Sequence, residues 1–261
     1  LSDKDLFMTF NQVKDNVSWT IGFRQSVIWQ INKADGFAGN PLQYTLWDSI
    51  NYNGKPLRNI CPAKYQIPPF DKNLYFLTVR NVDSINDSLF VTEVDNSYIS
   101  GNAQLSTKVM KLPVSYGFPP NAREKLVGPK NNYLMTNDAR VLAAIYENGY
   151  VHFGSNTVNP AYMNAGVYLG TIKNISEANP VITADIFSSQ TMEYGYPSMT
   201  VVGNIPDHKI LYTFSHCITD SFPGTSVLLK VGNGDYSDIV SVRDGLSIIN
   251  VLADTVERWG D

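Results

Sequence analysis

Short runs of apolar residues, each bounded by turn-forming residues, follow one another along almost the whole chain. Alternating apolar and polar positions in runs of this length are typical of β-strands that bury one face. Only two stretches have helical character: residues 175–178 allow one turn at most, and for residues 246–256 we expect extended structure. Asn148-Gly149 lies between two β-rich runs, which predicts a two-residue hairpin with a type I′ turn. The pattern therefore predicts an all-β protein.

One hairpin pattern occurs four times along the chain. We expect its first strands at 6–10, 74–78, 150–154 and 210–214, and its second strands at 26–31, 88–94, 166–172 and 226–231. A more polar strand follows each hairpin, at 43–47, 105–112, 181–187 and 239–243, and a strand precedes three of them, at 59–65, 140–146 and 196–203. The units start 60 to 76 residues apart, which is too variable for a solenoid. Four antiparallel strands per unit are typical of a β-propeller blade.

The distribution of apolar residues supports this interpretation. A four-stranded sheet with two apolar faces cannot bury both faces alone, whereas sheets stacked around an axis bury each face against a neighbour. We therefore predict one β-propeller segment over residues 1–261, with blade units at about 1–50, 59–112, 140–187 and 196–243. A large two-sheet sandwich or a jelly roll is the alternative.

The predicted units are incomplete at both ends of the chain. The first unit lacks its innermost strand, and residues 258–261 are expected to begin the innermost strand of a further unit. We therefore expect either a partial ring of about four blades or additional chain segments that complete the ring.

Composition and charge narrow the classes of partner. The chain has 43% apolar and 17% charged residues, which is ample material for a core. Its net charge of −4 does not fit a nucleic-acid-binding protein. No apolar run approaches the roughly 18 to 20 residues that a transmembrane helix needs. We therefore expect neither nucleic acid nor a transmembrane segment.

Short motifs resemble a known family. Tyr196-Pro197-Ser198-Met199, followed by Arg258-Trp259-Gly260-Asp261, is similar to sialidase-like, BNR-type propeller domains of large exported proteins of Gram-negative bacteria. Residues 136–140 and 118–122 also resemble that family. The resemblance implies a six- or seven-bladed ring, secretion through a route such as type IX, and display at the cell surface or outside the cell. It does not by itself imply catalysis, because propellers host enzymes and passive binding modules alike.

Evidence for an enzyme is sparse in the sequence. A sialidase site needs an arginine cluster, a tyrosine nucleophile with a glutamate partner, and an aspartate. Only Arg58, Arg140 and Arg258 fall at or near predicted innermost strands, and the S-x-D-x-G-x-x-W repeat of sialidases is absent. The histidines show no metal-ligand spacing, and neither do the two cysteines, Cys61 and Cys217. We expect both cysteines to be buried free thiols, with a disulfide as the alternative.

The candidate ligand-binding residues are Asp138, Arg140, Arg258, Trp259 and Asp261. Arg258 and Asp261 are expected near the central channel, where they coordinate a ligand or ion. Alternatively, Trp259 packs between blades and the charges on either side of it join one blade to the next. A weaker Ca²⁺ candidate is the turn with Asp235 and Asp238, although a solvated turn is the simpler explanation. No other cofactor is expected.

Two functions follow from these observations. The first is a non-catalytic module of a large secreted or cell-surface protein, which serves adhesion, assembly or the binding of a protein or glycan on its loop face. The second is a sialidase-like carbohydrate-active enzyme with a degenerate site. An enzyme should bring arginine, tyrosine and acidic side chains together in one central pocket, and a binding module should not.

Overall fold

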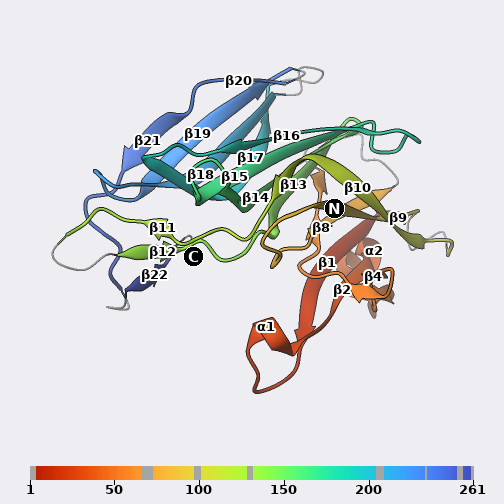
Figure 1. Cartoon of the computed structure of the whole chain (residues 1–261). Helices are drawn as coiled ribbons and strands as arrows, with labels where there is room; N and C mark the ends of the chain where they lie inside the picture. The colour runs from red at the N-terminus through yellow and green to blue at the C-terminus, as the bar shows by residue number, and fades with distance from the viewer. Residues whose placement is uncertain are drawn as a thin grey trace.

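Strands make up most of the computed structural model, which describes residues 4–65, 73–96, 101–127, 132–203, 209–232, 234–251 and 255–259 (Figure 1). The two helices, α1 (Trp19–Gly22) and α2 (Lys33–Ala38), are both short. The prediction of an all-β protein is therefore confirmed. No helix in the described part of the chain is long and apolar enough to cross a membrane.

The described residues form four large, mainly antiparallel sheets, which follow one another in chain order. The first contains β1 (Asp5–Val13), β2 (Phe23–Asn32) and β3 (Tyr44–Trp47). The second contains β10 (Gln104–Tyr116), β9 (Asn86–Asp95), β8 (Leu74–Val79) and β6 (Cys61–Pro62). The third contains β16 (Val181–Phe187), β15 (Asn164–Lys173), β14 (Tyr150–Asn159) and β13 (Val141–Glu147), with β7 (Lys64–Tyr65) added in parallel. The fourth contains β17 (Met192–Val202), β18 (Lys209–Ile218) and β19 (Gly224–Val231), and β19 also pairs with β20 (Asp235–Tyr236) and β21 (Val240–Asp244).

The predicted hairpins are confirmed by the strand pairing. Each predicted first strand pairs antiparallel with its predicted second strand, as β1–β2, β8–β9, β14–β15 and β18–β19. The polar strands that follow pair with the second strands, as β3, β10, β16 and β21. The preceding strands predicted at 140–146 and 196–203 correspond to β13 and β17, which pair with the first strands of their hairpins. The strand predicted at 59–65 is instead divided into β6, which pairs with β8, and β7, which pairs with β13 of the third sheet. Asn148 and Gly149 form the expected two-residue turn, with φ of 44° and 83°. These positive values are those of a type I′ turn.

Two small sheets complete the fold. One is the hairpin of β4 (Asn51–Tyr52) and β5 (Lys55–Pro56). The other contains β11 (Ala122–Arg123), β12 (Tyr133–Met135) and β22 (Val256–Arg258), and in it β22 runs parallel to β12. Residues 246–251, expected to be extended, form neither a helix nor a regular strand. The described residues do not close into a ring.

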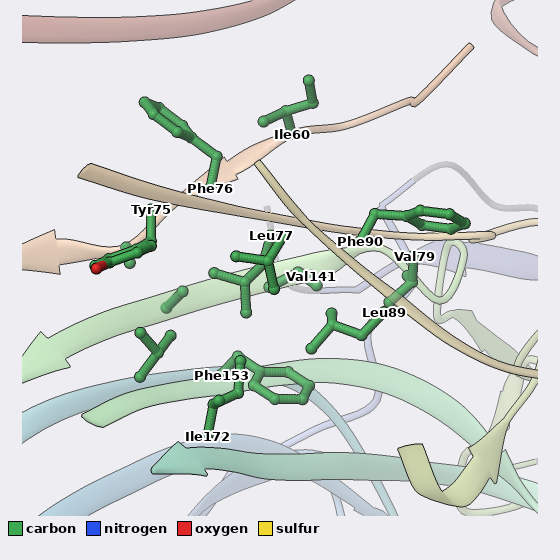
Figure 2. Close-up of a cluster of buried hydrophobic side chains, with 14 of the residues drawn as sticks. Ile60, Tyr75, Phe76, Leu77, Val79, Leu89, Phe90, Val141, Phe153 and Ile172 are labelled. Carbon is green, nitrogen blue, oxygen red and sulfur yellow. The ribbon is translucent and has the colours of Figure 1, made fainter. Parts of the chain in front are cut away.

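The large sheets pack against their neighbours in chain order. One hydrophobic cluster joins the second and third sheets, and Phe7 and Trp47 of the first sheet pack against it. Figure 2 shows Phe76 and Leu77 of β8 on one side of this cluster, and Phe153 and Ile172 of the third sheet on the other. A second cluster joins the third sheet to the fourth, by the side chains Ile145, Val167, Leu169, Tyr194, Met199, Ile210, Tyr212, Phe214 and Leu228. Each apolar face between two large sheets is thus buried by the next sheet.

Candidate functional site

The small sheet β11–β12–β22 packs against strands of the third and fourth sheets (Figure 1), and Tyr196 packs against the same cluster. Its buried face contributes Ala122, Leu134 and Trp259 to a cluster with Ala165 of β15 and Cys217 of β18. Cys217 is buried and its thiol donates to the Arg123 carbonyl at 2.9 Å. The small sheet is therefore fixed to the large ones by both apolar packing and hydrogen bonds.

Asp138 and Arg140 form an ion pair just before β13, in which the carboxylate is buried and the guanidinium is partly exposed. The guanidinium of Arg140 donates twice to the Asp138 carboxylate, with both distances at 2.7 Å. Asn81, from the second sheet's side, donates to the same carboxylate at 2.6 Å. Asp138 is 1% exposed. Bidentate geometry of this kind is strong and orients both groups. Asp138 therefore joins the second and third sheets.

Tyr196 lies at the centre of the predicted residues. It lies in a bulge of β17, and its φ of 56° is in the left-handed region that tyrosine rarely adopts. The Tyr196 N–H donates to the buried Asn156 side chain at 2.6 Å, and its hydroxyl donates to the Met135 carbonyl at 2.8 Å. Burial raises the pKa of Tyr196, Asp138 raises it further, and Arg140 and Arg258 lower it. The hydroxyl is therefore protonated at neutral pH and occupied as a donor.

Trp259 packs as expected of a residue between sheets. Its ring is 3% exposed and meets Tyr196 edge to face, with the centroids 6.0 Å apart. A Cβ at Gly195 would lie 3.0 Å from the Trp259 ring, so any other residue there would force the ring to shift. These contacts fit the interpretation in which Trp259 holds neighbouring sheets together.

The remaining predicted site residues lie apart from this junction. Asp235 and Asp238 lie on the exposed side of the fourth sheet, and Asp261 lies outside the described residues. Arg58 lies over the Phe23 ring of the first sheet, 4.5 Å from its centroid. No group of three metal-ligating side chains occurs in the described ranges.

The cysteines are free thiols, and the described histidines are buried beside hydrogen-bonding side chains. Cys61 and Cys217 are free thiols, as expected, although Cys61 is partly exposed rather than buried. Although the residue is partly exposed, desolvation of its thiol raises the pKa of Cys61 to about 12, which leaves it unreactive at neutral pH. His152 is buried beside Thr171, and His216 is buried with Ser226 and Asp244 within hydrogen-bond distance.

Sequence reasoning missed a cavity of about 640 Å³ on the outer side of the small sheet. Its walls come from the ends of β11 and β12 and from the turn after β18, with the lining residues Arg123, Glu124, Lys125, Leu126, Asn132, Tyr133, Thr219 and Asp220. A volume of this size is in the range of small-molecule sites. Its polar residues lie in short segments about 90 residues apart in the chain, so no local motif indicates it.

Arg123 is held in place on the cavity wall by a buried carboxylate. Its Nε donates to Glu193 Oε1 at 2.8 Å, and Glu193 also accepts from the backbone N–H of Ala165 at 2.9 Å. The Glu193 side chain is 3% exposed, whereas that of Arg123 is 49% exposed. Glu193 raises the pKa of Arg123, so the guanidinium is charged. The Nη groups have no partner in the described part of the chain and are available to an anion.

Glu124 places a buried carboxylate at the wall of the cavity. It is 2% exposed, and its Oε1 accepts from the backbone N–H of Ile249 at 2.8 Å. Its Oε2 is buried without a partner among the described residues. Burial raises the pKa of Glu124, the Ile249 bond lowers it and the neighbouring Glu257 raises it. Glu257 accepts from Val251 N–H at 3.1 Å, so the two carboxylates together hold residues 249–251.

Glu124→Gln is expected to raise the melting temperature by a few degrees at pH 7 to 8. The raised pKa means that burial of the charged form opposes folding once the pH exceeds the folded-state value, and below the unfolded value this cost is absent. The difference between variant and wild type should therefore shrink as the pH falls towards 4.5. Thermal unfolding followed by circular dichroism from pH 4 to 8 measures it. An equal difference at every pH would contradict the assignment.

A scan of protein-family models finds no match to the chain, and a search of curated proteins finds none either.

Proposed function

We propose that this chain is a non-catalytic binding module of a large secreted or cell-surface protein, and that its stacked sheets are blades of a partial β-propeller. The repeated order of strands supports the blade interpretation, since β10, β16 and β21 hold the same outer position in successive sheets. The resemblance of residues 196–199 and 258–261 to BNR-type propellers supports export.

The observation that carries the binding function is the cavity beside the small sheet. It combines a charged guanidinium fixed by Glu193, the Lys125 ammonium above the Phe222 ring at 5.1 Å, and the Tyr133 side chain. Glu124 and Asp220 also line the cavity, but Glu124 is bound to the Ile249 N–H, so the two cations are the groups placed to receive a ligand. Cationic donors beside aromatic rings favour a ligand that carries a carboxylate on an apolar or sugar framework. We propose a protein or glycan ligand of this chemistry.

Catalysis is the weaker proposal. Asp138, Arg140 and Arg258 do lie around Tyr196, which is the observation in favour of a degenerate sialidase-like site. However, the Tyr196 hydroxyl donates to a backbone carbonyl and Arg140 is paired with Asp138. A nucleophile needs a general base that accepts its proton, and the Met135 carbonyl cannot act as one.

A glycan array with neutral and acidic oligosaccharides tests the binding function. We expect the wild-type chain to bind acidic glycans, and Lys125→Gln to bind them severalfold more weakly because one cation of the cavity is lost. Lys14→Gln removes the same charge at the distant β1–β2 turn and should bind like the wild type. Equal binding by both variants, or no binding of acidic glycans, would contradict the cavity as the ligand site. Turnover of a fluorogenic sialoside that is lost in Tyr196→Phe would instead support the enzyme.

A further inference from the structure

The first sheet differs from the other three at one edge. In the later sheets, the first hairpin strand has a neighbour on both sides: β8 lies between β6 and β9, β14 between β13 and β15, and β18 between β17 and β19. β1 holds the equivalent position, but in the described part of the chain it pairs only with β2. One edge of this nine-residue strand therefore has no strand partner.

The register identifies the backbone groups at this edge. Lys33 N–H donates to the Lys4 carbonyl at 3.0 Å, so these two residues form a hydrogen-bonded pair. Such pairs alternate with non-bonded pairs along an antiparallel ladder. The N–H groups of Leu6, Met8 and Phe10 therefore point towards β2. Those of Phe7, Thr9 and Asn11 point outwards, and no backbone acceptor for them occurs among the described residues. An unpaired edge of this kind is a template for another strand.

The sheet face beside this edge is apolar and exposed. Met8 lies opposite Trp29, which in turn lies opposite Leu46, and Met8 and Leu46 are 45% and 43% exposed. On the same face, Trp29 contacts Phe10 and Tyr44, with ring centroids 5.8 and 5.6 Å apart. The opposite face carries Phe7 and Trp47, which pack on the core, so this sheet has one covered face and one open face.

Exposed apolar side chains are concentrated in this region. Ten of the 25 exposed large hydrophobic residues in the described chain lie within the first 46 positions. Figure 1 shows the hairpin of β1 and β2 projecting away from the other sheets, with α1 at its tip. Contiguous exposed apolar surface on a folded domain marks an interaction site.

We propose that the open edge of β1 binds an extended polypeptide segment of a partner protein, which adds a fourth strand to the first sheet. The outward N–H and C=O groups of Phe7, Thr9 and Asn11 would pair with the backbone of the segment, and its alternate side chains would pack beside Leu6, Met8 and Phe10. Neither a helix nor a lipid offers a row of backbone partners in this register, so the edge favours a strand.

The chain itself indicates the chemistry of the segment. The equivalent position in the third sheet is filled by β13, whose sequence VLAAIYE is apolar for six residues and free of proline. β6 and β17 hold this position in the second and fourth sheets and each contains a proline, so β13 is the equivalent strand with an unbroken apolar run. The partner segment should therefore be an extended run of about six apolar residues. This proposal concerns a surface distant from the cavity at Arg123, so either can fail without the other.

Amide hydrogen exchange with an end-capped synthetic peptide of residues 140–147 tests this proposal. We expect saturating peptide to slow exchange at Phe7, Thr9 and Asn11 by about tenfold or more, and to change the inward amides of Leu6 and Met8 much less. The same peptide with N-methyl groups on alternate residues, which cannot form the ladder, should give no protection. Absence of protection by the unmodified peptide, or equal protection by the methylated one, would overturn the proposal.

Two variants at Thr9 test whether the outward N–H groups of β1 bind the peptide. Thr9→Pro removes one outward N–H and keeps the β1–β2 ladder, and proline is tolerated on edge strands. Thr9→Val keeps the N–H with a similar shape. We expect the proline variant to bind the peptide about tenfold more weakly than the valine variant. Equal affinities would overturn the proposal. If Thr9→Pro does not fold, the methylated peptide decides.

A second copy of the chain is the alternative occupant of this edge. If the same amides became protected without peptide, and more so at higher protein concentration, a second copy would fill the edge and the proposal would be overturned.

Discussion

Replacing Asp138 by alanine is expected to lower the free energy of unfolding by about 3 to 5 kcal/mol. The carboxylate is 1% exposed and accepts from both Arg140 and Asn81, so its removal leaves a partly buried guanidinium and a buried amide without their acceptor. Asp138→Asn keeps the volume but loses the charge, and should fall between the alanine variant and the wild type. Urea unfolding followed by tryptophan fluorescence measures the difference.

The control for Asp138 is Asp87→Asn. Asp87 pairs with Lys111 at 3.7 Å, and both side chains are exposed, at 42% and 83%. Exposed ion pairs of this kind contribute about 0 to 1 kcal/mol. If Asp138→Ala and Asp87→Asn changed stability by similar small amounts, the Asp138 pair would not join the second and third sheets as described.

Lys230→Met is expected to stabilise the protein by up to about 3 kcal/mol at pH 7. Lys230 is 3% exposed. Burial lowers the pKa of its ammonium to about 8, although the nearby Asp185 raises it. Its Nζ donates to Thr171 at 2.6 Å and lies 5.1 Å from the Tyr236 centroid. These contacts compensate only part of the cost of burying the charge. The loss of the Thr171 bond makes this value an upper bound.

The pH dependence of Lys230→Met follows from the same values. Below pH 8 lysine is charged in both the folded and the unfolded state, so the full cost is present. Between pH 8 and 10.5 the unfolded state binds more protons than the folded state, and the wild type gains stability as the pH rises. The advantage of the methionine variant should therefore disappear over this range. Denaturant unfolding at pH 7, 9 and 10.5 checks it, and Lys209→Met serves as a control nearer the surface. A constant advantage would contradict a buried ammonium.

The strands were predictable because their signal is local. Each hairpin, such as β14–β15, carries apolar alternation between turn residues, and Asn148-Gly149 requires the positive φ that the structure has. Register and pairing then follow from short loops. The exceptions are the short strands of the two small sheets. Among them, β22 pairs in parallel with β12 more than 100 residues earlier, where the sequence predicted the start of a further blade. No periodicity in so short a segment indicates its partner.

The site was predictable only in part for the same reason. Asp138 and Arg140 are two residues apart, and their pairing is local, although the contact with Asn81 is not. Arg123 and Glu193 are 70 residues apart, and neither lies in a motif that indicates the other. Glu124 is buried although glutamate is rarely buried in proteins, so its residue type predicts an exposed position. Tertiary packing places these groups together, and a single sequence does not encode this in any local pattern.

The packing of the large sheets in chain order determines where local unfolding of the molecule begins. A sheet in the middle of the series gains from two apolar contacts, whereas the first and the fourth each gain from one, and the first adds only Ile28, Phe7 and Trp47 to its contact. Stability in such a series is close to a sum over neighbouring pairs. Local unfolding should therefore begin at the hairpin of β1 and β2 and then extend to the second sheet. Any strand that joins the edge of β1 would slow the loosening of the whole series from that end.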